Sequence, residues 1–170
     1  SMNKEYEYLK KVIYKVEIQN PVQEIYASQF KEYQNLEEVI LPDSITRIGE
    51  KAFYSCKKLE NIVVPEGLTE IGTGAFHSCT NLQNMNIPNS VKVIGDYAFY
   101  ACVSLQDINI PSELATIGNN AFYGCVLEKV TEIGSSEIEL PDIVKRALTS
   151  GDILNCGTGI SVSKGNISED

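Results

Sequence analysis

The side chains of this sequence best suited to nucleophilic or metal chemistry are five cysteines and a single histidine. Zinc sites draw their ligands from pairs of Cys or His that lie close together in the chain. Four of these cysteines instead recur once every 23 residues, at Cys56, Cys79, Cys102 and Cys125. This spacing predicts no metal site, and we expect four reduced, buried, small apolar side chains. The fifth, Cys156, lies outside the series and has no assigned role.

The histidine stands near one of these thiols, because His77 precedes Cys79 by two residues. A Cys–His nucleophile needs an exposed thiol within hydrogen-bond reach of the imidazole. Cys79 keeps the register of the buried series, so we expect no such pair. His77 shares its repeat position with Tyr54, Tyr100 and Tyr123, an outward column that either contacts a partner or merely covers the surface. Nucleophile-elbow, phosphate-loop and calcium-loop patterns do not occur, so the sequence predicts no enzyme and no catalytic, cofactor-binding or metal-binding residue.

Composition limits the partners of the chain. Its 170 residues carry a formal net charge of −9, and 43% of them are hydrophobic, which predicts a folded domain. Nucleic acids and acidic membrane surfaces attract clustered Lys and Arg, so neither is an expected partner. No apolar run reaches the roughly 20 residues of a membrane-spanning helix, so we expect no membrane insertion. The first residues also lack the apolar segment of a signal peptide.

The elements that position these residues follow from an internal repeat of 23 residues. Phenylalanine keeps this spacing without a slip, and so do most prolines and a set of glycines. The recurring positions are Phe30, Phe53, Phe76, Phe99 and Phe122; Pro42, Pro65, Pro88 and Pro111; and Gly49, Gly72, Gly95 and Gly118. Several residue types in one register indicate a solenoid, in which successive coils bury their apolar residues against each other.

Each repeat contains two kinds of apolar spacing. The pattern L-x-x-I-x-I-P, as in residues 59–65, has apolar residues two apart and predicts a short strand that the proline ends. The stretch 52–59 has helical spacing and predicts one or two tight helical turns. Parallel pairing of one strand with the next requires a crossover, and such crossovers are right-handed.

We therefore predict an α/β repeat solenoid. It is expected to be a right-handed arc with a parallel β-sheet on the concave face, short helical turns on the convex face and capping helices at the ends. Helical spacing of Tyr6, Leu9 and Val12 predicts the first helix, and Pro141 and Gly151 frame the last. The single domain, 1–170, divides into an N-terminal cap (1–12), repeats (about 13–133), a C-terminal cap (134–163) and a disordered tail (164–170).

The string I-G-x-x-A-F-x-x-C-x-x-L-x-x-I-x-I-P-x-x-V-x-x-I-G resembles the BspA-like, Treponema-type leucine-rich repeat, strongly over about residues 25–126 and loosely over 13–150. Ordinary leucine-rich repeats carry an inward Asn after the strand. This chain has Ser44, Gly67, Ser90 and Glu113 there, which suits the family. The resemblance implies a secreted or cell-surface protein of a host-associated microbe, linked to cell adhesion and to binding of fibronectin or fibrinogen. It does not identify the ligand of this chain.

The surface that the repeat offers to a partner is the outward face of the predicted sheet. No insertion interrupts residues 25–117, so recognition is expected from side chains of the sheet and not from a loop. The outward residues form two columns: Lys15, Glu38, Asn61, Asn84, Asp107 and Lys129; and Glu17, Ile40, Val63, Asn86, Asn109 and Thr131. The candidate partner-binding residues are Glu38, Ile40, Asn61, Val63, Asn84, Asn86, Asp107 and Asn109.

The function that this surface predicts is non-catalytic binding of a protein or glycoprotein, such as a host extracellular-matrix protein. A structural spacer domain of a larger surface protein is the alternative. A third interpretation also stays open, in which the sheet is polar for solubility alone. The full-length reading frame would separate a binding module from a spacer.

Overall fold

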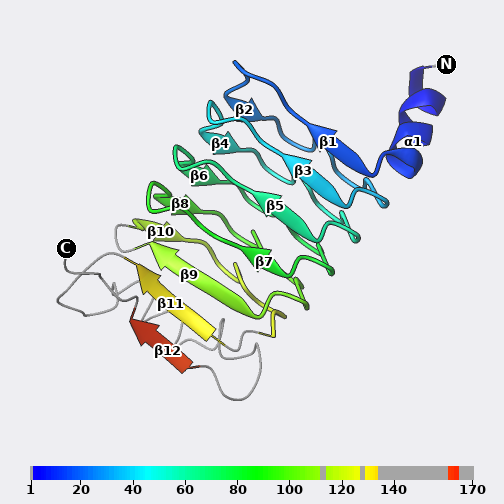
Figure 1. The fold of residues 1–170 in the computed structure, drawn as a ribbon. Coiled ribbons are helices and arrows are strands. Elements are labelled where there is room, and N and C mark those ends of the chain that lie inside the picture. The colour runs from blue at the N-terminus through cyan, green and yellow to red at the C-terminus, as the bar shows by residue number, and fades with distance from the viewer. Residues whose placement is uncertain (1, 112–113, 127–128, 134–160, 165–170) are drawn as a thin grey trace.

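The structure is a computed structural model that describes residues 2–111, 114–126, 129–133 and 161–164. It is a solenoid of stacked coils with two parallel sheets and one helix, α1 (Met2–Val12) (Figure 1). The seven-stranded large sheet has, in spatial order, β1 (Lys15–Glu17), β3 (Glu38–Ile40), β5 (Asn61–Val63), β7 (Asn84–Met85), β9 (Asp107–Pro111), β11 (Lys129–Ile133) and β12 (Ser161–Lys164). The predicted repeat solenoid is confirmed, while the right hand of the coil and the concave curvature of the large sheet stay predictions.

The strands of the large sheet form where apolar and polar residues alternate. In β3 and β5 the middle residue is buried and its two neighbours are exposed, which is the pattern of a strand with one face in the core. Each strand pairs with the strand 23 residues away, as in the alignment of Val39 with Ile62. A one-residue slip would turn the whole apolar set to solvent, so the repeat length sets the register.

The phenylalanine series lies at the centre of the core, as predicted. Phe53, Phe76 and Phe99 are fully buried, and each ring stacks on the next with centroids 5.2–5.5 Å apart along the series. The rings lie within 12° of parallel. Stacking of this kind requires that every coil hold its ring in the same rotamer, so the aromatic column aligns the coils as well as filling the core.

A second sheet, which the sequence did not reveal, lies on another side of the coils. This small sheet has, in spatial order, β10 (Thr116–Ile117), β8 (Val93–Ile94), β6 (Glu70–Ile71), β4 (Arg47–Ile48) and β2 (Glu24–Ile25), all parallel. Each strand has only two residues, too few for an alternating pattern to show in the sequence. The small sheet is recognised from its pairing: Arg47 and Ile48 pair with the equivalent residues of the coils on either side.

The helical turns predicted for residues 52–59 are not formed, and this prediction was wrong. The segment instead alternates donors that bond within the coil with donors that bond to the next coil. The first kind are Ala52 N to Gly49 O, Tyr54 N to Lys51 O and Cys56 N to Phe53 O; the second are Lys51 N to Thr73 O, Phe53 N to Ala75 O and Ser55 N to His77 O. A helix would use all of these donors within one coil. Here, half of these backbone donors bond to the neighbouring coil instead. Left-handed φ angles at Lys51 and Ser55 make this alternation possible.

The two ends of the described chain differ. At the N-terminus, α1 forms as predicted and stands beside the start of β1 (Figure 1), where the Tyr6 ring meets the edge of Tyr33 with centroids 6.3 Å apart. At the other end β12 pairs with β11, so residues expected in the C-terminal cap continue the sheet. Lys164, expected to begin a disordered tail, belongs to β12. The predicted helix at 141–148 lies outside the described residues. Within the described part, no helix is long and apolar enough to cross a membrane.

The recurring glycines lie where two coils approach most closely. At Gly95 an added Cβ would stand 2.5 Å from the backbone nitrogen of Thr73 in the preceding coil. Gly49, Gly72 and Gly118 meet the backbone of the preceding coil in the same way, at 2.7, 2.8 and 2.1 Å. The equivalent residue of the first described coil is Tyr26, which is exposed because no described coil lies beneath it.

Replacing Gly95 with Ala is therefore expected to destabilise the protein. The added methyl group forces the coils apart, and overpacking of this kind costs about 1–3 kcal/mol or more. Gly67→Ala is the matched control, because its Cβ would meet nothing closer than 3.7 Å, and it should change the stability by less than about 0.5 kcal/mol. Denaturant midpoints measure both. Equal midpoints for the two variants would show that the coils do not approach as closely as described.

Candidate functional site

The outward face of the large sheet brings the predicted site residues together. The register aligns Lys15, Glu38, Asn61, Asn84 and Asp107 with each other, and the backbone of Lys129 continues the row. Glu38, Asn61, Asn84 and Asp107 are all exposed. The predicted first column is confirmed, since residues 23 apart stand side by side on neighbouring strands.

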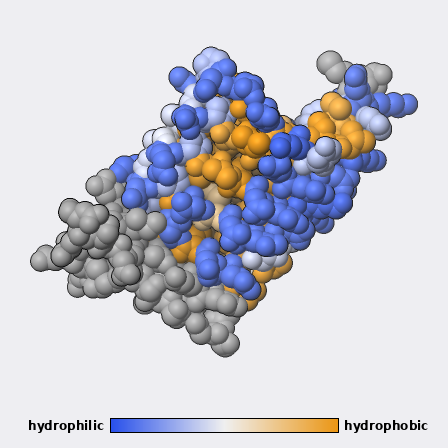
Figure 2. All heavy atoms as spheres, viewed as in Figure 1, coloured by the Kyte–Doolittle hydropathy of each residue, from blue (hydrophilic) through white to orange (hydrophobic). Residues whose placement is uncertain are grey.

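The second predicted column contains the apolar part of this face. Glu17, Ile40 and Val63 are aligned across β1, β3 and β5. Val63 is 78% exposed and Ile40 is 38% exposed, although both are β-branched hydrophobic residues. In the view of Figure 2, apolar residues gather over the stacked coils and hydrophilic residues line both sides. Ile40 and Val63 thus form a small apolar patch within a mainly polar face.

The two asparagines of the second column have different environments. Asn86 directly follows β7 and is exposed. Asn109 is half-buried, and its side-chain amide bonds the backbone of Ile87 in the preceding coil: Oδ1 accepts from the Ile87 nitrogen at 2.8 Å, and Nδ2 donates to the Ile87 carbonyl. The paired residues of β7 and β9 end at Met85 and Ile108, so this amide continues the connection between the coils where the backbone pairing stops. Asn109 is thus engaged within the fold, whereas Asn86 can reach a ligand.

The charges on the described part of this face lie on β1 and β3 and, farther along, at Asp107 of β9. Lys15 Nζ on β1 bonds Glu38 Oε2 on the neighbouring strand β3 at 2.9 Å. This hydrogen bond, and with it the negative charge of Glu38, raises the pKa of Lys15. Exposed pairs of this kind contribute little to stability. Lys15 thus offsets one of the two carboxylates that β1 and β3 present, Glu17 and Glu38, while β5 and β7 present the uncharged amides of Asn61 and Asn84.

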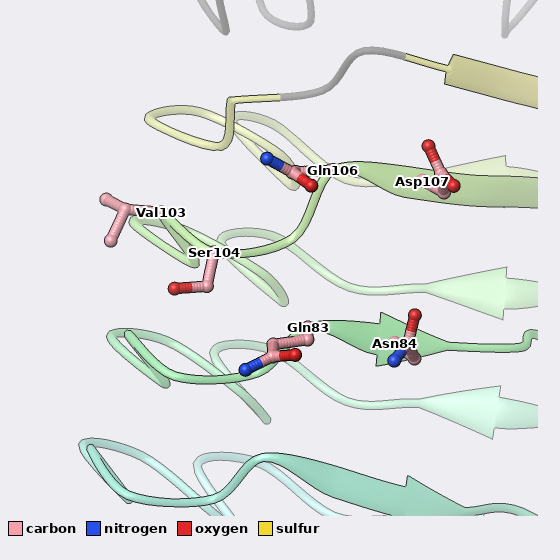
Figure 3. Close-up of a pocket in the computed structure, with 6 residues that line it drawn as sticks. All are labelled: Gln83, Asn84, Val103, Ser104, Gln106 and Asp107. Carbon is pink, nitrogen blue, oxygen red and sulfur yellow. The ribbon is translucent and has the colours of Figure 1, made fainter.

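A shallow hollow of about 360 Å³ lies between two coils beside the first column. Its lining residues are Gln83, Asn84, Val103, Ser104, Gln106 and Asp107 (Figure 3). Of these residues, only Asn84 and Asp107 were predicted as site residues from the sequence; Val103 and Ser104, on the turn before β9, were not. The sequence does contain a sign of the hollow. Val103 occupies the repeat position at which an earlier repeat has Lys57, so a short side chain replaces a long one. The hollow is small and polar for a buried ligand site, and it adjoins the outward face of the large sheet.

The cysteine series has a structural role that its spacing did not reveal. Each thiol donates a hydrogen bond to the carbonyl of a phenylalanine in the preceding coil, as Cys79 Sγ does to Phe53 O at 3.1 Å. The equivalent bonds of Cys56, Cys102 and Cys125 are 3.0–3.1 Å long. All four are buried and form no disulfide, as predicted. Burial raises the pKa of the Cys56 and Cys102 thiols to about 12 and that of Cys79 well above its usual value. A thiol that stays protonated is a hydrogen-bond donor and a poor nucleophile.

His77 belongs to a column of stacked rings on the turn side of the coils. Its imidazole lies between Tyr54 and Tyr100, with centroids 4.6 and 4.7 Å away, and Tyr123 continues the stack. His77 Nδ1 lies 2.8 Å from Ser78 Oγ. The Cys79 thiol bonds Phe53, so the described geometry shows no Cys–His pair. The ring faces in this column cover each other, which leaves mainly ring edges to solvent. No cluster of three or more His, Cys, Asp or Glu side chains able to hold a metal ion occurs in the described part of the chain.

The repeats of this chain are similar to those of several known proteins. Residues 3–139 match the family described as BspA type leucine rich repeat region, in six copies. A leucine-rich repeat protein from Bacteroides ovatus is 35% identical, with a TM-score of 0.66, over 70% of this chain and 31% of that protein. A leucine rich cell surface protein from Faecalibacterium prausnitzii is 25% identical, with a TM-score of 0.59, over 92% and 33%. The T. pallidum leucine rich repeat protein is 27% identical, with a TM-score of 0.55, over 92% and 88%. The chain thus spans about a third of the first two proteins. No curated protein shows significant similarity to it.

The four cysteines of the series are expected to react with a thiol reagent only after unfolding, because all four are buried and burial raises the pKa of Cys56, Cys79 and Cys102. A Cys156→Ser background removes the cysteine outside the described residues. Native protein at pH 8 should then show almost no labelling by a chromogenic disulfide, and denatured protein should show four thiols. Rapid labelling of several thiols in the native protein would contradict the described packing.

His77 is expected to titrate below its usual pKa of 6.5 in the folded protein, because burial and then the positive charge of Lys51 favour the neutral imidazole. Folding is therefore favoured most above the unfolded-state pKa, and stability should fall as the pH drops from about 6.5 through the folded-state pKa. Histidine resonances followed by NMR give the titration midpoint. The variant His77→Tyr, which carries the residue of the neighbouring repeats, should lose this part of the pH dependence. A midpoint at or above 6.5 would contradict the expectation.

Proposed function

The chain belongs to the BspA-type leucine-rich repeat family, and from this premise we propose that it is a non-catalytic protein-binding module whose partner docks on the outward face of the large sheet. The family is a protein-interaction fold of bacterial surface-type proteins. What supports the assignment to this particular face is Val63, a β-branched apolar side chain that is 78% exposed beside Ile40. Its exposed methyl groups, next to those of Ile40, offer apolar surface that a partner could cover.

The composition of the face fits a protein partner. An apolar centre of Ile40 and Val63 is bordered by amides at Asn61, Asn84 and Asn86, which can donate and accept hydrogen bonds. Interfaces commonly combine an apolar centre with a polar rim. Six strands from β1 to β11 at about 4.8 Å spacing make the face roughly 25 Å wide, enough for a protein surface.

The rigidity of the face favours recognition without rearrangement. The strands at its centre, β3 to β9, are paired on both sides, and the coils have no inserted loop between residues 25 and 111. A partner therefore meets a preformed surface, which lowers the entropy lost on binding. The resemblance to adhesion proteins makes fibronectin and fibrinogen the first probes, and an extracellular or cell-surface location is part of the proposal.

The double variant Val63→Lys/Asn86→Lys is expected to fold normally and to lose binding, because both side chains point to solvent in the middle of the face. Removal of such a centre typically costs 2 kcal/mol or more, which corresponds to an affinity lower by about 30-fold. Surface plasmon resonance against immobilised fibronectin and fibrinogen measures the change.

The matched control is Asn81→Lys/Asn89→Lys, which adds the same two positive charges at exposed residues outside the two columns and should bind like the unmodified chain. Binding that survives the double variant but falls in Tyr54→Ala or Tyr100→Ala would move the site to the stacked rings. Should the unmodified chain bind neither probe and no other surface protein, the structural spacer is the better assignment.

A further inference from the structure

The solenoid has an open end at its first coil. Four apolar residues there are only partly buried, whereas their counterparts in the next coil are at most 9% exposed. The pairs are Ile13 and Leu36, Val16 and Val39, Ile18 and Leu41, and Phe30 and Phe53. The helix α1 stands to one side of this end (Figure 1), and its own Leu9 and Val12 are 38% and 44% exposed. A layer that would complete the packing of the first coil is therefore missing from the described chain.

The same end carries an open sheet edge. β1 is the terminal strand of the large sheet among the described residues. Its bonds to β3 include Ile18 N to Ile40 O and Glu38 N to Tyr14 O. Backbone groups alternate in direction along a strand, so the N–H and C=O groups of Lys15 and Glu17 point the other way, toward the open edge. These four groups can pair with another strand.

The charges of β1 specify which strand fits. Its sequence is Lys15-Val16-Glu17, with both charged side chains on the outward face. When such a strand pairs antiparallel with a copy of itself about Val16, each Lys15 lies opposite Glu17 of the second copy. The registers centred on Lys15 or on Glu17 would instead set like charges opposite each other, which is unfavourable. A lysine on an edge strand ordinarily discourages pairing with another strand. In the register centred on Val16, however, Lys15 attracts Glu17 of the second copy.

The backbone geometry selects the same register. In an antiparallel pair, two directly opposite residues exchange both of their hydrogen bonds when their backbone groups face each other. Lys15 and Glu17 are the residues of β1 whose groups face the edge. Centring on Val16 sets each of them opposite the other, so charge and hydrogen bonding agree.

We propose that β1 pairs antiparallel with β1 of a second copy of this chain, joining two solenoids end to end about a two-fold axis through Val16. The large sheet then continues from one copy into the other, and the partly buried Ile13, Ile18 and Phe30 of each copy gain apolar neighbours. The contact is isologous, since the same surface serves both subunits and the assembly closes as a dimer. It lies at the edge of the sheet and does not depend on the proposed ligand face.

A precedent for the charge arrangement occurs in the small sheet of this protein. Arg47 bonds Glu24 in the preceding coil at 3.2 Å and Glu70 in the following coil at 3.1 Å. In the dimer, Lys15 would lie in the same way between Glu38 of its own chain and Glu17 of the second copy. One cation between two carboxylates on neighbouring strands is thus an arrangement that this solenoid already accommodates.

The experiment is sedimentation equilibrium of the chain and of charge variants of β1, with circular dichroism as a check of folding. The unmodified chain should associate to twice its mass of 18.8 kDa at concentrations up to about 100 µM. Lys15→Glu makes the strand wholly acidic and Glu17→Lys makes it wholly basic, so each should weaken self-association about tenfold or more. The double variant K15E/E17K exchanges the charges and should restore it.

Mixing is the decisive arm, because the acidic strand of K15E and the basic strand of E17K should form a heterodimer that neither forms alone. Lys57→Glu and Glu60→Lys change the charge equally at exposed positions away from β1 and should leave the association unchanged. The proposal is overturned if the unmodified chain stays monomeric, if K15E and E17K associate as well as it does, or if their mixture remains monomeric.

Discussion

The spacing between successive coils is the constraint on which the other features of this protein depend. Backbone hydrogen bonds link each coil to the next through the large sheet, the small sheet and the turns, so the distance is set on every side. Strands paired in this way lie about 4.8 Å apart. That distance leaves no space for a Cβ where Gly95 crosses the preceding coil, and it brings the phenylalanine rings to centroid separations of 5.2–5.5 Å.

The cysteine series shows how this spacing selects a residue type. The carbonyl of Phe53 accepts two hydrogen bonds, one from the Cys56 nitrogen of its own coil and one from the Cys79 thiol of the next. A side chain in this position must be small, mostly apolar and able to donate one bond, and cysteine meets all three requirements. Burial keeps the thiol protonated, which preserves the donor and suppresses its reactivity. Residues that resemble a reactive cluster in the sequence therefore serve to hold coils together.

The surface of the protein varies where the core does not. Inward positions repeat nearly the same residue in every coil, because each coil has the same neighbours to pack against. Outward positions of the large sheet are free of this requirement and change from charged residues at β1 and β3 to amides at β5 and β7. The face and the ends therefore differ between coils more than the core does, and both proposed interaction surfaces lie there. Asn109 is intermediate between the inward and the outward positions, because it belongs to an outward column but its side-chain amide bonds the backbone of the preceding coil.

The sequence by itself determined the repeat length, the strands of the large sheet, the buried phenylalanines and cysteines, and the columns that contain Val63 and Asn61. All of these follow from residues 23 apart occupying equivalent places in neighbouring coils. Only the tertiary structure decided the path of the chain between the strands of the large sheet. Helical spacing at 52–59 shows which side chains turn inward, but the partners of the backbone donors belong to another coil, and local spacing does not specify them. The same holds for the small sheet, for the Cys–Phe bonds and for the amide of Asn109, because each joins coils through groups whose proximity arises only when the coils stack.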